Sequence, residues 1–337
     1  MAYSQNTYLK AKQELELRRE TAEDEAQRRR DDCFAKFPEL REIQQKLSRI
    51  GFQISKSFLD GGDIQESIRR LSVESLALQT EREFILEQAG LPKEYLKVRY
   101  CCEICSDTGF DGDRFCKCHK ELLAKIEKDE ISRYAPIHKC TFANFDISYY
   151  SAEATSSGVS PKEVVSRIYE GCKNYAASFT RQSKSLLLLG GTGLGKTHLS
   201  LAVANEVIDK GFSVVYGSAH SILSDLESLR FGRNTNVRYE EPELLECDLL
   251  IIDDLGAEFI SQFTVSCIYN IVNSRILSER PTIISTNLTV EDLEAKYDRR
   301  ITSRLTSCYS ILRFFGRDVR QIKKRNAVNT GGNIDDH

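Results

Sequence analysis

The stretch GGTGLGKTHLS, residues 190–200, decides the fold that this sequence predicts. It fits the pattern G-x-x-x-x-G-K-[ST], whose glycines let a loop close around phosphate oxygens. The apolar run 185–189 before it predicts a buried parallel strand, and an apolar helical face begins at Leu199. This order of strand, glycine loop and helix is the context that a phosphate-binding loop requires. The residues expected to line the nucleotide are Gly190, Gly191, Thr192, Gly193, Leu194, Gly195, Lys196, Thr197 and His198.

The side chains of this loop predict which parts of a nucleotide would be held. Lys196 would neutralise negative charge on the β- and γ-phosphates, and the Thr197 hydroxyl would bind Mg²⁺. Inward-facing N–H groups and the N-terminus of the following helix would add positive potential. The alternative is a glycine-rich turn that binds nothing, but the complete motif between a strand and a helix favours an ATP site.

The chain of 337 residues is long enough for about two domains with a sizeable core. Its net charge of −3 requires no nucleic-acid partner, so any DNA-binding surface must be local. No apolar run approaches the ~20 residues that span a bilayer, and the N-terminal residues contain no apolar signal core. These features favour a cytoplasmic protein, in which disulfides are rare.

Five of the eleven cysteines lie between residues 101 and 118, in the sequence CCEICSDTGFDGDRFCKC. A C-x₂-C pair and a C-x-C pair form two short knuckles, and the glycines between them let the chain double back. Four thiolates from two knuckles predict a closed, tetrahedral Zn²⁺ site with a structural role. The expected ligands are Cys102, Cys105, Cys116 and Cys118. The fourth ligand stays open between Cys118, Cys101 and His119, and a group of free cytosolic thiols is the alternative.

The region before the cysteines predicts helices and contains no recognisable catalytic residues. Residues 10–32 are dense in charges of both signs and predict a solvated helix, with a nucleic-acid patch as the alternative. Apolar residues recur on one helical face over residues 40–50 and again over residues 64–85. A glycine turn at residues 60–63 separates these two stretches, which predicts a helical hairpin. A helical domain of this kind is most simply an interaction module.

From residue 161 onward helical and strand patterns alternate, which predicts an α/β fold with a parallel sheet sandwiched by helices. Strands are expected at residues 185–189, 213–216, 249–252, 282–285 and 309–314. Helices are expected at residues 121–134, 161–179, 220–230 and 262–278, besides the helix that follows the glycine loop. The small polar stretch 151–160 predicts a loop, and the last dozen residues, 326–337, predict a disordered tail.

Polar residues follow two of these strands and predict the rest of an NTPase site. Asp253 would hold Mg²⁺ opposite Thr197, and Asp254 would orient or deprotonate the attacking water. Aspartates at strand ends often cap turns, but their position after a phosphate-binding loop favours the catalytic interpretation. Asn287 follows the next strand, where its amide could contact the γ-phosphate or the water, or cap the next helix.

A basic segment, DRRITSRL at residues 298–305, follows in this otherwise nearly neutral chain. Arg299, Arg300 or Arg304 could act as an arginine finger on a neighbouring subunit's phosphate, with solvated surface arginines as the alternative. Further basic residues continue to the C-terminus, and one of them could lie over the phosphates of its own chain. These residues are Arg313, Arg317, Arg320, Lys323, Lys324 and Arg325.

In their order and spacing, GGTGLGKTHLS, LLIIDDLGAE, ISTNLT and DRRITSRL resemble the AAA+ ATPases of the DnaC/DnaI/IstB group. This group contains bacterial replicative-helicase loaders and transposition helper ATPases. The resemblance covers roughly residues 130–325 and implies an ASCE-type P-loop fold, ATP-dependent assembly into a ring or helical oligomer, and binding of single-stranded DNA. The implied roles are Walker A for Lys196 and Thr197, Walker B for Asp253 and Asp254, sensor 1 for Asn287, arginine finger for Arg304 and sensor 2 for Arg320. Many AAA+ proteins have glutamate at the position of Asp254, although this group often carries the aspartate pair.

The pattern CxxCxDTG followed by CxC resembles the zinc-bearing N-terminal part of DnaI-type loaders, which contacts the helicase in that family. The predicted organisation is a helical interaction region (1–96), a zinc module with a linker helix (97–135), an AAA+ domain (136–325) and a tail (326–337). The implied function is ATP-dependent loading of the replicative DNA helicase, with ATP, Mg²⁺ and Zn²⁺ as cofactors. An IstB-like transposition helper, a P-loop small-molecule kinase and a non-enzymatic zinc adaptor with a relict P-loop are the alternatives.

Three arginines lie between the second predicted strand and the Walker B strand, where the related ATPases place a helical element that faces DNA. They are Arg230, Arg233 and Arg238. Glutamates at residues 240, 241 and 243 limit the positive potential of this surface, so binding of single-stranded DNA is expected to be weak and strongly salt-dependent.

Overall fold

The computed structural model describes residues 3, 5–57, 64–155, 158–232 and 237–330. The chain forms two compact units, one of residues 12–119 and one of residues 1–11 together with 120–337. The predicted glycine turn at residues 60–63 and Arg233 lie outside the described residues. Within the described ranges, no helix is both long and apolar enough to cross a membrane.

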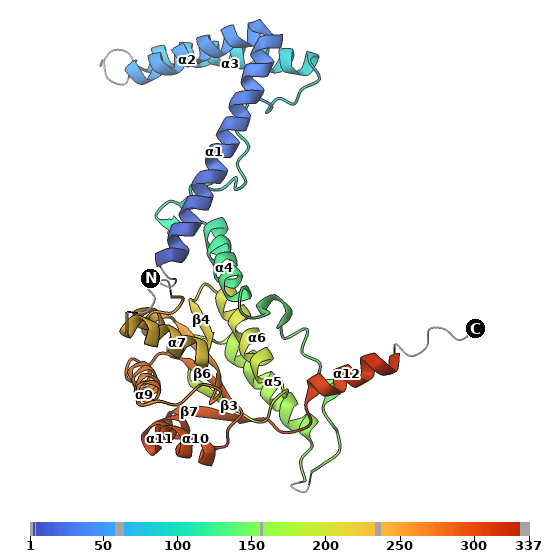
Figure 1. The fold of residues 1–337 in the computed structure, drawn as a ribbon. Coiled ribbons are helices and arrows are strands. Elements are labelled where there is room, and N and C mark those ends of the chain that lie inside the picture. The colour runs from blue at the N-terminus through green and yellow to red at the C-terminus, as the bar shows by residue number, and fades with distance from the viewer. Residues whose placement is uncertain (1–2, 4, 58–63, 156–157, 233–236, 331–337) are drawn as a thin grey trace, which may run out of the picture. The chain divides into compact units, whose positions relative to one another are not determined.

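The unit of residues 12–119 contains most of helix α1 (Gln5–Lys36) and the two helices α2 (Pro38–Ser57) and α3 (Ile64–Gln88). Helices α2 and α3 pack against each other, as Figure 1 shows. Their contact buries apolar side chains that recur every seven residues on each helix, which places them on one face. These side chains are Ile43 and Ile50 on α2, and Leu71 and Leu78 on α3. The predicted hairpin of two apolar-faced helices is therefore confirmed for the described residues.

The cysteine-rich segment of this unit folds around a two-stranded antiparallel ribbon. Strand β1 (Phe110–Asp111) pairs with β2 (Arg114–Phe115), so the chain doubles back as the glycines between the cysteine pairs predicted. Helix α4 (Lys117–Ser132) begins at the second cysteine pair.

The other unit is built on a parallel sheet of five strands in the order β4-β5-β6-β3-β7. The strands are β3 (Ser185–Leu189), β4 (Val214–Ser218), β5 (Leu249–Leu255), β6 (Thr282–Thr286) and β7 (Tyr309–Arg313). All five predicted strands are present. Strand β5 runs three residues further than predicted, so both aspartates belong to it rather than following it.

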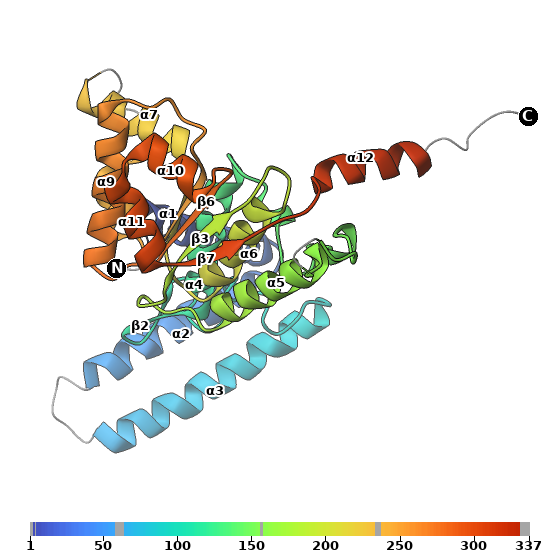
Figure 2. The same ribbon diagram turned by 90° about the horizontal axis from the view of Figure 1, so that it is seen from below.

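Helices cover both faces of this sheet because successive side chains of a buried strand point to opposite sides (Figures 1 and 2). In β3, Leu186 and Leu188 face the core that α5 (Pro161–Ala177) and α6 (Lys196–Asp209) share, whereas Leu187 faces the opposite core. Helices α7 (Ala219–Arg230), α8 (Glu241–Glu246), α9 (Gln262–Leu277), α10 (Val290–Tyr297) and α11 (Arg299–Cys308) contribute to that second core. The predicted α/β sandwich is thus confirmed.

A fully buried arginine connects elements of the second core. The Arg275 side chain on α9 is 0% exposed, and its guanidinium donates to the Thr282 hydroxyl and to the carbonyl oxygens of Leu244 and Pro281, at 2.6–2.8 Å. These bonds satisfy carbonyl groups at the end of α8 and at the entry to β6, which apolar side chains could not do. Among the described residues no carboxylate pairs with this charge, which is instead buried with several hydrogen bonds.

The structure divides the chain at residues 119 and 120, whereas the sequence predicted a boundary between residues 135 and 136. The part of α4 after Lys120 packs with the core that α5 and α6 share, through Ala124 and Ile131. Glu127 is buried there and accepts hydrogen bonds from the Val214 N–H at 3.2 Å and the Thr7 hydroxyl at 3.1 Å. Burial raises the pKa of Glu127 to about 7.

The predicted tail needs a correction. Helix α12 spans Val319–Thr330, so residues 326–330 are helical rather than disordered. The last seven residues, 331–337, lie outside the described part of the chain. The N-terminus of α12 is attached to the glycine loop, because the Val319 N–H donates to the Gly193 carbonyl at 3.1 Å.

Candidate nucleotide site and metal centre

The loop between β3 and α6 adopts a backbone that requires glycine at its ends. Gly195 precedes α6 with a φ of +88°, and a Cβ there would lie 2.7 Å from Cε2 of Phe145. Gly190 has a φ of +150°, and a Cβ there would lie 2.5 Å from the Phe314 carbonyl oxygen. Both contacts are too short for a side chain, and a positive φ disfavours any residue except glycine. The glycines of the motif therefore allow the loop to lie between β7 and the segment that contains Phe145.

Lys196 is held at the centre of this loop. Its ammonium donates to the carbonyl oxygens of Gly190 and Gly191 at 2.7 and 2.8 Å and to Oδ1 of Asn287 at 2.6 Å. The side chain is buried, and this burial lowers the pKa of Lys196, while Asp254 and Asp253 act in the opposite direction. The lysine is thus a positive charge fixed next to the loop, in the place where its predicted role requires one.

Asp253 is a buried carboxylate that accepts hydrogen bonds from three hydroxyl groups. The Thr197 hydroxyl donates to it at 2.9 Å, and the Tyr216 hydroxyl donates to its Oδ2 at 2.8 Å. The Ser285 hydroxyl donates to its Oδ1. Burial, followed by the charge of Asp253, raises the pKa of Tyr216, so its hydroxyl stays protonated and remains a donor. The two predicted magnesium ligands, Thr197 and Asp253, therefore lie in direct contact.

Asp254 lies next to this carboxylate in a different environment. Its backbone has a φ of +53°, and its N–H donates to the Ser285 hydroxyl at 3.0 Å. Burial and the neighbouring Asp253 raise the pKa of Asp254, whereas Lys196 and Arg320 lower it. The Asn287 amide connects the two sides of the site: Oδ1 accepts from Lys196, and Nδ2 donates to Asp254 at 3.5 Å. Asp254 and Asn287 are thus brought together as a predicted base and orienting amide require.

A cavity of about 280 Å³ opens over the loop. Residues 192–198 form one wall, and Asp254, Asn287 and Arg320 line it from other elements. The segment 136–150 lines it on a further side, and Nε2 of His198 lies 2.9 Å from the Thr141 carbonyl oxygen in that segment. The predicted sensor residue Arg320 therefore belongs to the same cavity as the loop.

The predicted arginine finger lies elsewhere. Arg304 is on α11, where its guanidinium donates to Oδ1 of Asn273 and to the Tyr269 hydroxyl of α9, each at 2.9 Å. Arg300, one turn earlier, lies over the ring of Tyr269, and Arg299 is exposed. None of these three arginines is among the residues that line the cavity of the same chain. A finger role would require a second chain, so that role remains a prediction.

Sequence reasoning missed three side chains around the site. Tyr216 and Ser285 both bind Asp253, and the Asp318 carboxylate fills the space next to Gly193. Tyr216 lies in β4, Ser285 in β6 and Asp318 just before α12; Ser285 belongs to the quoted ISTNLT motif, but no role was predicted for it. Only the pairing of β4 and β6 with β5 indicates that polar side chains near the ends of these strands meet.

The four expected zinc ligands form one cluster. The sulfur atoms of Cys102, Cys105, Cys116 and Cys118 all lie within 4.8 Å of one another. In two of the pairs, Cys102 lies 3.7 Å from Cys116 and Cys105 lies 3.4 Å from Cys118. Zn–S bonds of about 2.3 Å place tetrahedral sulfurs about 3.8 Å apart, so this donor set fits Zn²⁺.

The two other candidate ligands, Cys101 and His119, lie outside the sulfur cluster. Cys101 is exposed, whereas His119 is buried with Nδ1 3.2 Å from the Gly109 carbonyl oxygen. The Asp107 carboxylate accepts from the N–H groups of Cys101 and Cys102 at 2.8 and 2.9 Å, which fixes the first knuckle. Of the three candidates for the fourth ligand, Cys118 is the one that lies in the sulfur cluster.

The arginines expected to face DNA differ from one another. Arg230 is exposed at the end of α7. Arg238 instead donates to the Tyr216 carbonyl at 3.1 Å, and its guanidinium lies 3.6 Å from the centre of the Tyr134 ring. These contacts hold the Arg238 side chain against Tyr216 and Tyr134, and the role of both arginines in DNA binding stays a prediction.

Residues 164–314 match the family model described as "IstB-like ATP binding protein". The replicative helicase loader DnaC of Buchnera aphidicola (subsp. Baizongia pistaciae) is 29% identical over 168 residues, or 49% of this chain and 63% of that protein. DnaC of Escherichia coli K12 is 27% identical over 171 residues, or 50% of this chain and 64% of that protein. The matches span slightly less than two thirds of these relatives. The resemblance predicted from the motifs is confirmed for the ATPase part of the chain.

Two solved structures are also similar. The crystal structure of the DnaC helicase loader has a TM-score of 0.43 and 21% identity, covering 52% of this chain and 98% of that chain. The crystal structure of DnaI has a TM-score of 0.41 and 20% identity, covering 55% of this chain and 93% of that chain.

Replacement of Lys196 with alanine should remove the positive charge of the loop. We expect ATP turnover to fall by roughly 10²- to 10³-fold, the size of effect seen when one electrostatic stabiliser is removed. The thermal unfolding midpoint should change little, because the lysine contributes little to the apolar core. The matched control is Lys184→Ala, an exposed lysine just before β3. Turnover in Lys196→Ala that equals the turnover of the control would contradict the assigned site.

Replacement of Cys118 with serine tests the metal centre and its fourth ligand. One zinc per chain should co-purify with the wild type, and Cys118→Ser should lose it because the sulfur cluster is then incomplete. Cys101→Ser should keep its zinc, since that thiol lies outside the cluster. Elemental analysis of protein purified under reducing conditions measures both. Loss of zinc from Cys101→Ser alone would reverse the ligand assignment.

Proposed function

We propose that this protein is an ATP-dependent loader of the replicative DNA helicase. The observation that carries the proposal is the presence in one chain of a cavity lined by Lys196, Asn287 and Arg320 and of a four-cysteine cluster, each in its own compact unit. Similarity of the ATPase part to DnaC loaders supports the same function. The N-terminal helices and the cysteine centre would then bind the helicase, and the ATPase unit would bind single-stranded DNA.

The residues of the site support an ATPase chemistry in which each has a distinct task. Lys196 would neutralise phosphate charge, and the Thr197 hydroxyl with the Asp253 carboxylate would hold Mg²⁺. A magnesium ion bound there supplies the charge that stabilises the phosphates during hydrolysis. Asp254, whose pKa is raised, would accept a proton from the attacking water, and the Asn287 amide would orient that water. Arg320 would contact the phosphates from the same chain.

Assembly of several chains is part of the proposal. Arg304 is held on the surface of α11 and α9 rather than in its own cavity, which suits a residue that acts on a neighbour. Besides its hydrogen bonds to the Tyr269 hydroxyl and the Asn273 amide oxygen, the Arg304 guanidinium lies over the Tyr269 ring, 4.7 Å from the ring centre. These contacts hold the side chain in one direction, as a finger residue requires.

A transposition helper is the second candidate. The match of residues 164–314 to the IstB-like family model is the observation in its favour. The cysteine centre and the N-terminal helices favour the loader, because the cysteine pattern resembles the zinc-bearing part of DnaI-type loaders. A small-molecule kinase is less well supported, since the chain has a separate metal module and a basic segment on α11.

Capture of partners from the native cells separates these candidates. The tagged full chain should recover the replicative helicase in the presence of ATP, and Cys102→Ser should weaken that capture because it disturbs the N-terminal unit. The matched control Cys101→Ser should capture the helicase normally. Single-stranded DNA should stimulate ATP turnover, with a strong salt dependence. Recovery of a transposase instead of the helicase would favour the second candidate, and phosphorylation of a small molecule would favour a kinase.

Mixing of two inactive variants tests the finger in trans. Arg304→Ala should bind ATP normally but hydrolyse it more slowly, by up to ~10³-fold. Lys196→Ala has a finger but no competent site, so mixed assemblies should regain part of the activity. Arg300→Ala is tested in parallel because it lies one turn away on the same face. If neither mixture regains activity where the wild type assembles, Arg304 has no role in a neighbour's site.

A further inference from the structure

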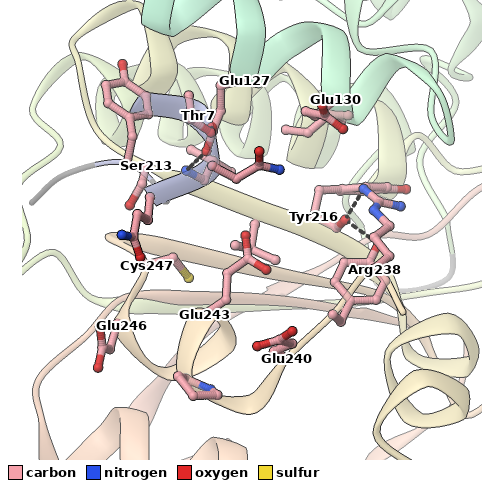
Figure 3. A pocket seen from close by; sticks show the side chains of 18 of the residues that line it. Thr7, Glu127, Glu130, Ser213, Tyr216, Arg238, Glu240, Glu243, Glu246 and Cys247 are labelled. Carbon is pink, nitrogen blue, oxygen red and sulfur yellow. Dashed lines mark hydrogen bonds between the residues drawn. The ribbon is translucent and has the colours of Figure 1, made fainter. Parts of the chain in front are cut away.

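The outer side of strand β4 forms the wall of a cavity of about 690 Å³ (Figure 3). Strand β4 is an edge strand of the sheet, and no strand of the described residues pairs with its outer side. Tyr216 lies between this cavity and the nucleotide site: its backbone faces the cavity, and its hydroxyl reaches Asp253. The same residue therefore lines this cavity and contacts the Asp253 carboxylate.

The hydroxyl of Tyr216 helps to fix the Asp253 carboxylate. It donates to Oδ2 at 2.8 Å, while Thr197 donates to the same oxygen at 2.9 Å. Hydrogen-bond donors of this kind set the orientation of a metal-binding carboxylate, and their removal typically weakens metal binding by about 10- to 100-fold. Tyr216 is itself buried, so water does not easily replace its hydroxyl.

Two side chains hold the backbone of Tyr216 from the cavity side. Figure 3 shows that Arg238 points at this residue, and its guanidinium donates to the Tyr216 carbonyl at 3.1 Å. The Tyr239 hydroxyl donates to the same carbonyl at 2.7 Å. Both donors are fixed in turn, because the Asp225 carboxylate accepts from the N–H groups of Arg238 and Tyr239 at 3.0 and 3.2 Å.

The neighbouring residue in β4 makes this arrangement possible. Gly217 has no side chain, and a Cβ there would lie 2.6 Å from the Tyr239 hydroxyl oxygen. Any larger residue would move Tyr239 away from the Tyr216 carbonyl. A tyrosine side chain has only two torsions, so the position of its hydroxyl follows the position of its backbone. A fixed carbonyl therefore means a fixed donor at Asp253.

We propose that Tyr216 is a positioning residue for the magnesium-binding carboxylate of Asp253, and that Arg238 and Tyr239 set its position through its backbone carbonyl. The inference rests on the proposed function as a Mg²⁺-dependent ATPase. It gives Arg238 a role inside the ATPase unit in place of a contact to DNA.

The test measures binding of the slowly hydrolysed analogue ATPγS to the full chain by calorimetry, in EDTA and over a series of Mg²⁺ concentrations. Mg²⁺ should increase the affinity for ATPγS. In Tyr216→Phe we expect the Mg²⁺ concentration that gives half of this increase to rise about tenfold. Affinity in EDTA should stay unchanged, because the phenylalanine ring keeps the packing. Arg238→Ala and Tyr239→Phe should shift the Mg²⁺ dependence in the same direction by a smaller factor. The matched control is Tyr309→Phe, a buried tyrosine at the start of β7 on the opposite edge of the sheet.

A cycle with Asp253→Asn separates positioning from general loosening. Tyr216→Phe should cause no further shift in the Asp253→Asn background, since the carboxylate that it positions is absent. An unchanged Mg²⁺ dependence in Tyr216→Phe, or an equal loss of affinity in EDTA, would overturn the proposal. An unchanged dependence in both Arg238→Ala and Tyr239→Phe would overturn the role of the carbonyl contacts. A wild type without Mg²⁺-dependent nucleotide binding would refute the proposed function itself, and the inference with it.

Discussion

The burial of the Asp253 charge is the constraint on which the nucleotide site depends. A carboxylate that is 4% exposed at the end of a parallel sheet must be satisfied by the protein, and here three hydroxyl groups from α6, β4 and β6 do so. Two of these donors lie on β4 and β6, the strands that flank β5. The strand order β4-β5-β6 therefore places both hydroxyl groups next to the Asp253 carboxylate. The neighbouring Asp254 shares one of these hydroxyls through its N–H, which links the two acidic residues into one network.

A second set of contacts joins the glycine loop to the elements around it. Lys196 and Asn287 connect α6 to the end of β6, and the Val319 N–H connects α12 to the loop. The buried Arg275 also joins separate elements. Its guanidinium connects α9 with the end of α8 and the start of β6. Polar groups in low-dielectric surroundings bind strongly when they are fully paired, so networks of this kind hold a site in one geometry. Such rigidity is what electrostatic catalysis of phosphoryl transfer requires.

The cysteine centre lies in a segment that is too small to form an apolar core. The segment between residues 101 and 119 has a two-stranded ribbon that is too small to be stable by itself. Four clustered sulfur atoms could hold a metal ion in place of an apolar core, and Asp107 fixes the first knuckle by accepting from two backbone N–H groups. The spacing of the cysteines was enough to predict this cluster, because short knuckles leave few ways to bring four thiolates together.

The sequence by itself determined the elements whose signals are local. The glycine motif, the apolar strands and the helical periodicities predicted the sheet, the hairpin of α2 and α3, and the cysteine cluster, because backbone preference and side-chain period act over a few residues. Tertiary structure decided which strands are neighbours, and hence that Tyr216 and Ser285 meet at Asp253 and that α4 belongs partly to the ATPase unit. It also decided that Arg238 binds the Tyr216 carbonyl and that α12 continues through residues predicted to be disordered. These features depend on contacts between residues far apart in the chain, and no local pattern encodes such contacts.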